Sequence, residues 1–187
     1  PADEERRLLL AGCYDAIGEA LKMRDDLIHD WNAEEGNPVR PSVVMLDDET
    51  LRDGLQSPSV VDPPIEKKRE MLHLMDRLGI DTANIGLPGA GPRAENDVLA
   101  LCREIEASKL KIRANCAART IAKDVDPIIR VVERTGVPIE ACLFIGSSPI
   151  RQYAEGWDEA FLVRQSTEAI GYAVAHGLSV LYVTEDT

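Results

Sequence analysis

The sequence predicts an α/β fold built from repeated strand and helix units with parallel strands. Five short apolar runs, each typical of a buried strand, begin near residues 43, 81, 112, 140 and 178. One strand therefore follows another about every 35 residues, a spacing that leaves room for a covering helix and two loops. Apolar residues recur at helical spacing between these runs. Such a regular succession favours a parallel sheet covered by helices.

The composition indicates an acidic globular protein. Of the 187 residues, 44% are hydrophobic, and the formal net charge is -12. This charge disfavours nucleic acid and anionic membranes as partners. The N-terminus carries no signal-peptide pattern, and no apolar run approaches the ~18 residues of a membrane span. Because the four cysteines form no C-x-x-C pair, we expect a reduced, cytoplasmic protein. These cysteines are Cys13, Cys102, Cys116 and Cys142.

Residues 1–40 are expected to form a helical extension ahead of residues 41–187, which hold all five strands. Apolar residues recur at helical spacing between Asp3 and Trp31, and Gly36-Asn37-Pro38 ends the pattern. The segment precedes the first strand, so it is not part of a strand and helix repeat. We expect it to pack on the strand region or across a dimer interface.

The first strand is expected at Val43–Leu46, and the polar loop after it contains candidates for chemistry. Asp53 at the mouth of a strand can supply an oxygen ligand for a divalent metal ion, and neighbouring Arg52 can stabilise an oxyanion. Gly54 permits a tight turn, and Gln56 adds a neutral hydrogen-bonding group. On composition alone, a solvated acidic loop with one arginine for charge balance is the simpler interpretation.

Helix and strand patterns alternate through the rest of the chain. Pro63-Pro64 and Gly79 mark the ends of the next helix, because proline begins and glycine ends many helices. We expect helices at residues 65–78 and 94–106, through 128–132 up to Gly136, and at 158–175. Runs of strand-forming residues predict strands at residues 82–87, 111–116, 140–145 and 178–183. His29, His73 and His176 are interpreted as structural or surface residues.

The loop after the first strand carries a specific motif. Asp48-Glu49-Thr50-Leu51-Arg52-Asp53-Gly54-Leu55-Gln56 resembles the D-x-T-L-R-D-G-x-Q signature of the family that contains 2-isopropylmalate, homocitrate and citramalate synthases and 3-hydroxy-3-methylglutaryl-CoA lyase. The lyases share only the R-D-G-L-Q part, so the residues before it favour the synthases. The resemblance implies a TIM (β/α)8 barrel, of which this chain would cover about the first five strands. It also implies that Asp53 binds a divalent metal (Mg, Mn or Zn), that Arg52 is catalytic, and that Gln56 binds substrate.

The second and third strands continue the resemblance. Ala83-Asn84-Ile85-Gly86-Leu87-Pro88 is similar to the family's I-E-x-G-x-P segment, but Asn84 replaces the usual glutamate. That replacement removes one carboxylate from the implied site. Arg119 matches an Ala-Arg pair in the third-strand loop, which implies a contact with a substrate carboxylate or CoA phosphate. A salt-bridged surface arginine is an equally good interpretation of Arg119.

The fourth and fifth strands extend it further. Residues 144–150 are similar to the family's F-I-x-[ST]-S-P-I segment, which implies substrate-binding roles for Ser148 and for Arg151 just after it. Arg151 stands where many members have histidine, and its longer cationic fork can hold a carboxylate with two hydrogen bonds. Glu185 matches the family's E-D pair, which implies a catalytic acid or base.

The activity implied by the resemblance is a Claisen-type condensation of acetyl-CoA with a 2-keto acid, as in 2-isopropylmalate synthase and leucine biosynthesis. Acetyl-CoA would be the co-substrate, and a homodimer the expected assembly. Three alternatives stay open: the lyase direction, a catalytically inactive half-barrel that binds a partner chain, and a carboxyltransferase or aldolase relative.

Five strands cannot close an eight-stranded barrel. The family completes its metal site with an H-x-H pair on the seventh strand, and the three histidines of this sequence form no such pair. An open half-barrel would expose strand edges and an apolar interior. We therefore expect a fragment of a longer protein rather than a natural half-barrel.

Overall fold

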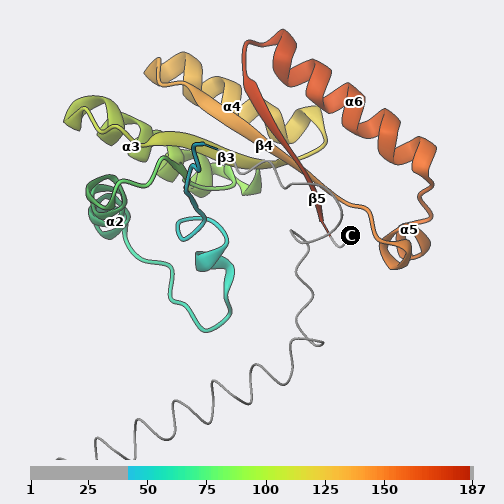
Figure 1. Ribbon diagram of the computed structural model, residues 1–187, viewed down its shortest axis with the longest axis horizontal. Helices are drawn as coiled ribbons and strands as arrows, with labels where there is room; N and C mark the ends of the chain where they lie inside the picture. Colours follow the sequence, from blue (N-terminus) through green and yellow to red (C-terminus); the bar gives the residue numbers. More distant parts are fainter. Residues whose placement is uncertain (1–41, 186–187) are drawn as a thin grey trace, which may run out of the picture. The chain divides into compact units, whose positions relative to one another are not determined.

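The computed structural model describes residues 42–185 of the chain (Figure 1). The helical extension expected at residues 1–40 lies outside the described residues, so it stays a prediction. A compact unit begins at Met45, and it contains the helices and strands described below.

Five parallel strands form one sheet in the order β1-β2-β3-β4-β5 (Figure 1). Strands that follow one another in the chain are neighbours in the sheet, as in the wall of a (β/α)8 barrel. The predicted fold class is therefore confirmed, and the five strands form a half-barrel. The strands are β1 (Asp47–Asp48), β2 (Thr82–Asn84), β3 (Arg113–Arg119), β4 (Ile139–Gly146) and β5 (Ser179–Glu185).

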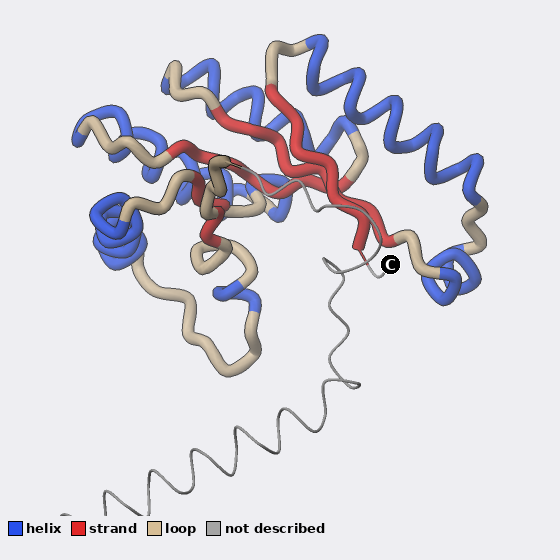
Figure 2. Tube along the Cα trace, in the orientation of Figure 1, coloured by secondary structure: helices blue, strands red, loops and turns tan. Residues whose placement is uncertain are grey.

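Helices connect the strands and cover one face of the sheet (Figure 2). The helix after β1 ends at Gly79, whose φ of 80° suits a residue without a side chain. Asp158 begins the last helix, where its side chain accepts a hydrogen bond from the Phe161 backbone. The helices are α2 (Ile65–Leu78), α3 (Pro92–Ser108), α4 (Ala122–Thr135), α5 (Pro149–Glu155) and α6 (Glu159–Ala175), with short 3-10 turns η2 (Gly54–Gln56) and η3 (Pro88–Ala90).

Side chains alternate between the two faces of each strand, and the two faces differ in polarity. The helix-covered face is apolar, and its side chains are fully buried on β2, β3 and β4, as at Ala83, Cys116 and Leu143. We call the opposite face, which the helices do not cover, the concave face. The strand register places polar side chains there on the first three strands. Side chains of the concave face include Asp47, Asn84, Asn115, Glu140 and Cys142.

The first strand differs from the prediction. Val43–Leu46 was expected as a buried strand, yet these side chains are between 54% and 73% exposed, and β1 begins only at Asp47. Strand β1 stands at one end of the sheet and pairs only with β2 among the described residues. Its pairing begins at Leu46, whose carbonyl accepts from the Thr82 backbone at 3.1 Å. An edge position supplies fewer neighbours than a central strand, so an apolar run there need not be buried.

Two further details correct the sequence analysis. Strand β2 ends at Asn84 instead of Leu87, although the Ile85 N–H still donates to the Asn115 carbonyl at 2.9 Å and the Gly86 carbonyl accepts from the Ala117 N–H at 3.0 Å. Helix α5 was not expected, although Ser148 followed by Pro149 is a recognisable helix start. No helix within residues 42–185 is both long and apolar enough to cross a bilayer.

Candidate functional site

The carboxyl ends of β1 to β5 carry the predicted site residues. After β1 the chain makes a tight turn in which the backbone N–H groups of Arg52 and Gly54 both donate to the Glu49 carbonyl at 3.1 Å. The Asp48 side chain fixes the entry to this turn by accepting from the Thr50 backbone at 2.8 Å. Leu51 is only 4% exposed and anchors the loop in the apolar core. The first half of the motif is therefore fixed by these contacts rather than free in solvent.

Arg52 lies between two carboxylates. Its Nη2 is 3.1 Å from Glu49 Oε2, and its Nη1 donates to Asp53 Oδ1 at 3.2 Å. The Arg52 side chain is 16% exposed, and its Nε is buried without a hydrogen-bond partner among the described residues. The guanidinium that these two carboxylates hold also lines the first cavity described below, where it is suited to stabilise negative charge on a substrate oxygen.

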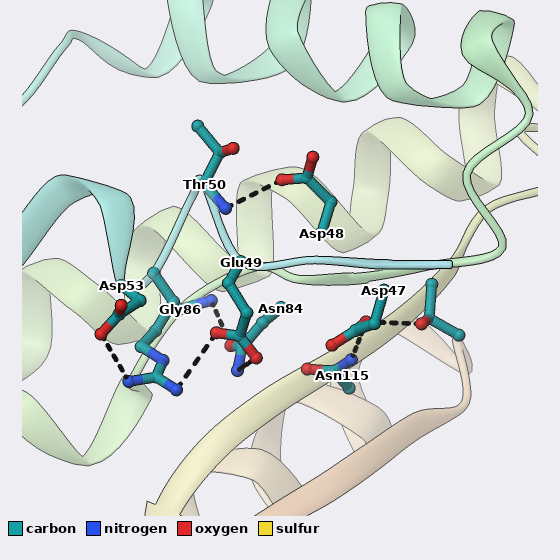
Figure 3. Close-up of polar contacts among 10 residues, drawn as sticks. Asp47, Asp48, Glu49, Thr50, Asp53, Asn84, Gly86 and Asn115 are labelled. Atoms are coloured by element: carbon teal, nitrogen blue, oxygen red, sulfur yellow. Dashed lines mark hydrogen bonds and ion pairs between the residues drawn. The ribbon is translucent and has the colours of Figure 1, made fainter. Parts of the chain in front are cut away.

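The concave face places amides beside these carboxylates (Figure 3). Asn84 on β2, with a fully buried side chain, donates from Nδ2 to Glu49 Oε1 at 3.1 Å. Asn115 on β3 donates to Asp47 Oδ1 at 2.7 Å, and its own Oδ1 is buried without a partner among the described residues. Burial, reinforced by the negative charge of Glu49, raises the pKa of the nearby Cys142 thiol to about 11. This part of the concave face is therefore rich in negative charge and in hydrogen-bonding groups.

The Asp53 carboxylate is the right type of ligand for a divalent metal ion, but the described residues do not bring enough ligands together to hold one. Its carboxylate is 67% exposed, and only one oxygen is engaged by Arg52. A free carboxylate oxygen is a suitable ligand for Mg²⁺, Mn²⁺ or Zn²⁺. Within residues 42–185, however, no three His, Cys, Asp or Glu side chains gather closely enough to hold a metal ion together.

Arg52 and Gln56 line one cavity, of about 490 Å³, between the β1 loop and the loop that follows β2. Lys68 on α2 closes part of its wall and is 6% exposed. Burial alone would lower the pKa of Lys68, but its hydrogen bonds to Asp62 and Asp97 outweigh this and hold the pKa above its usual value. Because Lys68 is paired with two aspartates, it supports the wall rather than offering free charge.

Arg119, Arg151 and Glu185 line a second cavity, of about 350 Å³, at the carboxyl ends of β3, β4 and β5. Its apolar wall includes Trp157 and Phe161, whose rings stack with centroids 5.0 Å apart. The Arg151 guanidinium lies 5.9 Å from the centre of the Trp157 ring. A pocket with cationic, acidic and aromatic groups can hold a small organic acid.

The predicted residues thus fall into three groups. Arg52 and Gln56 share the first cavity, and Arg119, Arg151 and Glu185 share the second. Ser148 lines neither of them; its hydroxyl accepts from the Arg151 backbone at 3.2 Å and caps α5. Asp53 stands on the β1 loop beside Arg52.

Several residues of the site were not identified from the sequence. Glu49 occupies a variable position of the motif, yet it joins β1 to β2 and faces Arg52. Asn115 was hidden inside an apolar strand, although its register with Asn84 would have placed both on one face. Trp157 lies between two helices, and no local pattern ties it to Arg151. Alternation along a strand could have identified Asn115, whereas Glu49 lies in the polar loop after the first strand, where strand alternation does not apply.

Comparisons with known proteins agree on one family. The model of the HMGL-like family matches residues 43–187. Homocitrate synthase AksA of Methanopyrus kandleri is 32% identical over 147 residues, which are 78% of this chain and 34% of that protein. The 2-isopropylmalate synthase of Methanocaldococcus jannaschii is 30% identical over 148 residues, 78% of this chain and 26% of that protein. Homocitrate synthase of Pyrococcus abyssi is 30% identical over 147 residues, 76% of this chain and 37% of that protein. The chain therefore spans between 26% and 37% of the length of these relatives.

Proposed function

This chain belongs to the HMGL-like family, and from that premise we propose that it takes part in a Claisen-type condensation of acetyl-CoA with a 2-keto acid. Such an acyltransferase would be 2-isopropylmalate synthase-like and would serve amino-acid biosynthesis, with leucine as the candidate end product. A base removes a methyl proton from acetyl-CoA, and the resulting carbanion forms a carbon–carbon bond with the keto carbon. Water then cleaves the thioester and releases CoA and a 2-hydroxy diacid.

The observation that carries the proposal is the state of Arg52. Its guanidinium is held between Glu49 and Asp53 and lines the first cavity, which a substrate can enter. Both the enolate of acetyl-CoA and the alkoxide formed from the keto acid place negative charge on an oxygen. A pre-oriented N–H donor stabilises such charge more in the transition state than in the ground state.

Other residues take roles that follow from their positions. Gln56, in the same cavity as Arg52, would orient the substrate. The family resemblance also implies a substrate contact for Ser148, although its hydroxyl caps α5 and lines neither cavity. Arg151 would hold a carboxylate in the second cavity together with Nη1 of Arg119, whose Nε and Nη2 are bound to Asp124. Glu185, at the end of β5, would act as acid or base.

Asp53 would contribute one carboxylate to a divalent metal ion, Mg²⁺, Mn²⁺ or Zn²⁺. When bound, the metal would polarise the keto carbonyl. We further propose a homodimer in the cytoplasm, with small-molecule substrates as its ligands.

Thiol release tests the proposal. The full-length protein, incubated with acetyl-CoA and a panel of 2-keto acids, should release CoA with at least one of them. Replacing Arg52 by Gln should lower kcat by about a hundredfold to a thousandfold, the usual effect of removing one oxyanion donor. Arg77→Gln, at the end of α2, is the matched control and should keep full activity.

Two other outcomes would redirect the assignment. Acetyl-CoA produced from a hydroxyacyl-CoA, without any release of CoA from acetyl-CoA, would favour the lyase direction. An absence of both reactions, together with a stable complex with another chain, would favour the binding module.

A further inference from the structure

Glu49 joins the buried part of β2 to the guanidinium of Arg52 (Figure 3). One carboxylate oxygen, Oε1, accepts from Asn84 Nδ2 at 3.1 Å. The other, Oε2, lies 3.1 Å from Arg52 Nη2, close enough for an ion pair although it does not meet hydrogen-bond geometry. The carboxylate thus has one oxygen on β2 and one on the arginine.

Asn84 is the fixed end of this arrangement. Its side chain is fully buried, and its Oδ1 accepts from the Gly86 backbone at 3.4 Å. With that contact made, Nδ2 is left as the group that faces Glu49. A buried amide with both ends engaged reorients at a cost, because each lost hydrogen bond leaves a desolvated polar group. Asn84 therefore holds the Glu49 carboxylate in one place.

The charges at positions 49 and 84 suit Arg52 when only one of the two side chains is a carboxylate. Asn84 is neutral, so the single negative charge of Glu49 faces the positive charge of Arg52. A carboxylate at position 84 would lie against the Glu49 carboxylate. Two like charges at hydrogen-bond distance repel strongly where water is excluded. If position 84 carried the carboxylate and position 49 the amide, the net charge beside Arg52 would be unchanged.

We propose that Glu49 is the positioning residue for Arg52, and that Asn84 must remain neutral because the carboxylate that faces it stands at position 49, directly after β1. The part of this inference that rests on the proposed function is the claim that an oriented Arg52 acts on substrate. Glu49 itself touches Arg52 and Asn84, and it acts through Arg52.

Chemical modification measures the orientation of Arg52 without reference to activity. The terminal nitrogens of arginine add to the carbonyl carbons of phenylglyoxal, and peptide mass spectrometry reports the rate of this modification at Arg52 in the full-length protein. Glu49→Gln keeps the shape but removes the charge, and it should speed modification of Arg52 by about tenfold, the effect of losing one charged contact. Asp48→Asn removes the same charge from the neighbouring residue but keeps the acceptor for the Thr50 backbone, so the rate of Arg52 modification should match the wild type.

The exchanged pair provides the rescue. Asn84→Glu alone should speed modification, because the two carboxylates push each other away from Arg52. Combining Glu49→Gln with Asn84→Glu should slow modification again and recover at least part of the kcat/KM that each single variant loses. A wild-type rate in Glu49→Gln, or an exchanged pair as reactive as Asn84→Glu, would overturn the inference. If the wild type performs no condensation, the proposed function fails, while the modification rates still decide whether Glu49 positions Arg52.

Discussion

The guanidinium of Arg119 donates two hydrogen bonds to the Asp124 carboxylate, with Nε–Oδ2 at 2.6 Å and Nη2–Oδ1 at 3.0 Å. The two partners differ in exposure: the Asp124 side chain is 3% exposed and the Arg119 side chain 62%. This pairing raises the pKa of Arg119. It also ties the end of β3 to the first turn of α4, where a carboxylate faces the positive end of the helix dipole.

The unequal burial of this pair leads to a prediction about stability. Arg119→Ala leaves a buried carboxylate without its cation, and we expect the free energy of unfolding to fall by about 1–3 kcal/mol. Water screens the exposed arginine, which keeps the value below that of a fully buried pair. Removing both partners should cost less than the sum of the two single changes. Urea unfolding of the two single variants and the double variant measures this, and additive effects would contradict the pairing.

Gly86, in the loop after β2, has no room for a side chain. A Cβ there would lie 2.8 Å from Val98 Cγ2, and the φ of 149° is strained for any residue with a side chain. Because Val98 is fully buried on α3, it has little room to move aside. Gly86→Ala should therefore destabilise the protein by about 1–3 kcal/mol. Gly171→Ala, in α6 with nothing within 4 Å of the new Cβ, should leave stability unchanged or slightly increase it. Thermal melts of the two variants measure the difference.

The sequence was sufficient for elements whose local pattern agrees with their place in the fold. Helix α2 was predicted at its observed ends because Pro64 and Gly79 are start and stop residues whose geometry the structure uses. The central strands were also found, since β4 is buried on both faces and reads as a continuous apolar run. The first strand was predicted at the wrong residues because Val43–Leu46 has the composition of a buried strand. Composition does not show whether a strand has a neighbouring strand on both sides.

The candidate site was predictable only where a motif is contiguous. Arg52 and Asp53 are adjacent in the sequence and lie in contact. The link between Glu49 and Asn84 joins positions 35 residues apart, and it depends on the register of β1 and β2. The division of the site residues between two cavities depends on how loops from separate strands meet, which spacing along the chain does not encode.

A bridge between α3 and α4 predicts how stability depends on pH. Arg130 donates to Glu95 from Nε at 3.1 Å and from Nη2 at 2.6 Å. These hydrogen bonds hold the pKa of Glu95 below its unfolded value near 4.5. A lowered pKa in the folded state means that the stabilisation is present above pH 4.5 and is lost as the pH falls through the folded-state pKa.

The matched variant for this bridge is Arg130→Gln. At pH 7 the free energy of unfolding of the wild type should be about 0.5–1 kcal/mol higher than that of Arg130→Gln. The difference is modest because the arginine is half exposed. The difference should shrink as the pH falls below 4.5 and vanish once Glu95 is protonated in the folded state. Urea titrations at several pH values between 3 and 7 would reveal it. A difference that stays constant over this range would show that the bridge is not the cause.

Helix α2 offers a matched pair of leucines that tests which of its faces packs on the sheet. Leu72 is fully buried, whereas Leu74, two residues later, is 48% exposed. Two residues along a helix turn the side chain through more than half of a circle, so the two positions point to different surroundings. Leu72→Ala removes buried methyl groups and leaves a cavity, which should lower the free energy of unfolding by about 2–5 kcal/mol. Leu74→Ala should change it by less than about 0.5 kcal/mol, since exposed substitutions seldom exceed that value and alanine favours the helix. Equal losses in urea unfolding of the two variants would mean that α2 is rotated from the position described, and with it the wall that Lys68 forms in the first cavity.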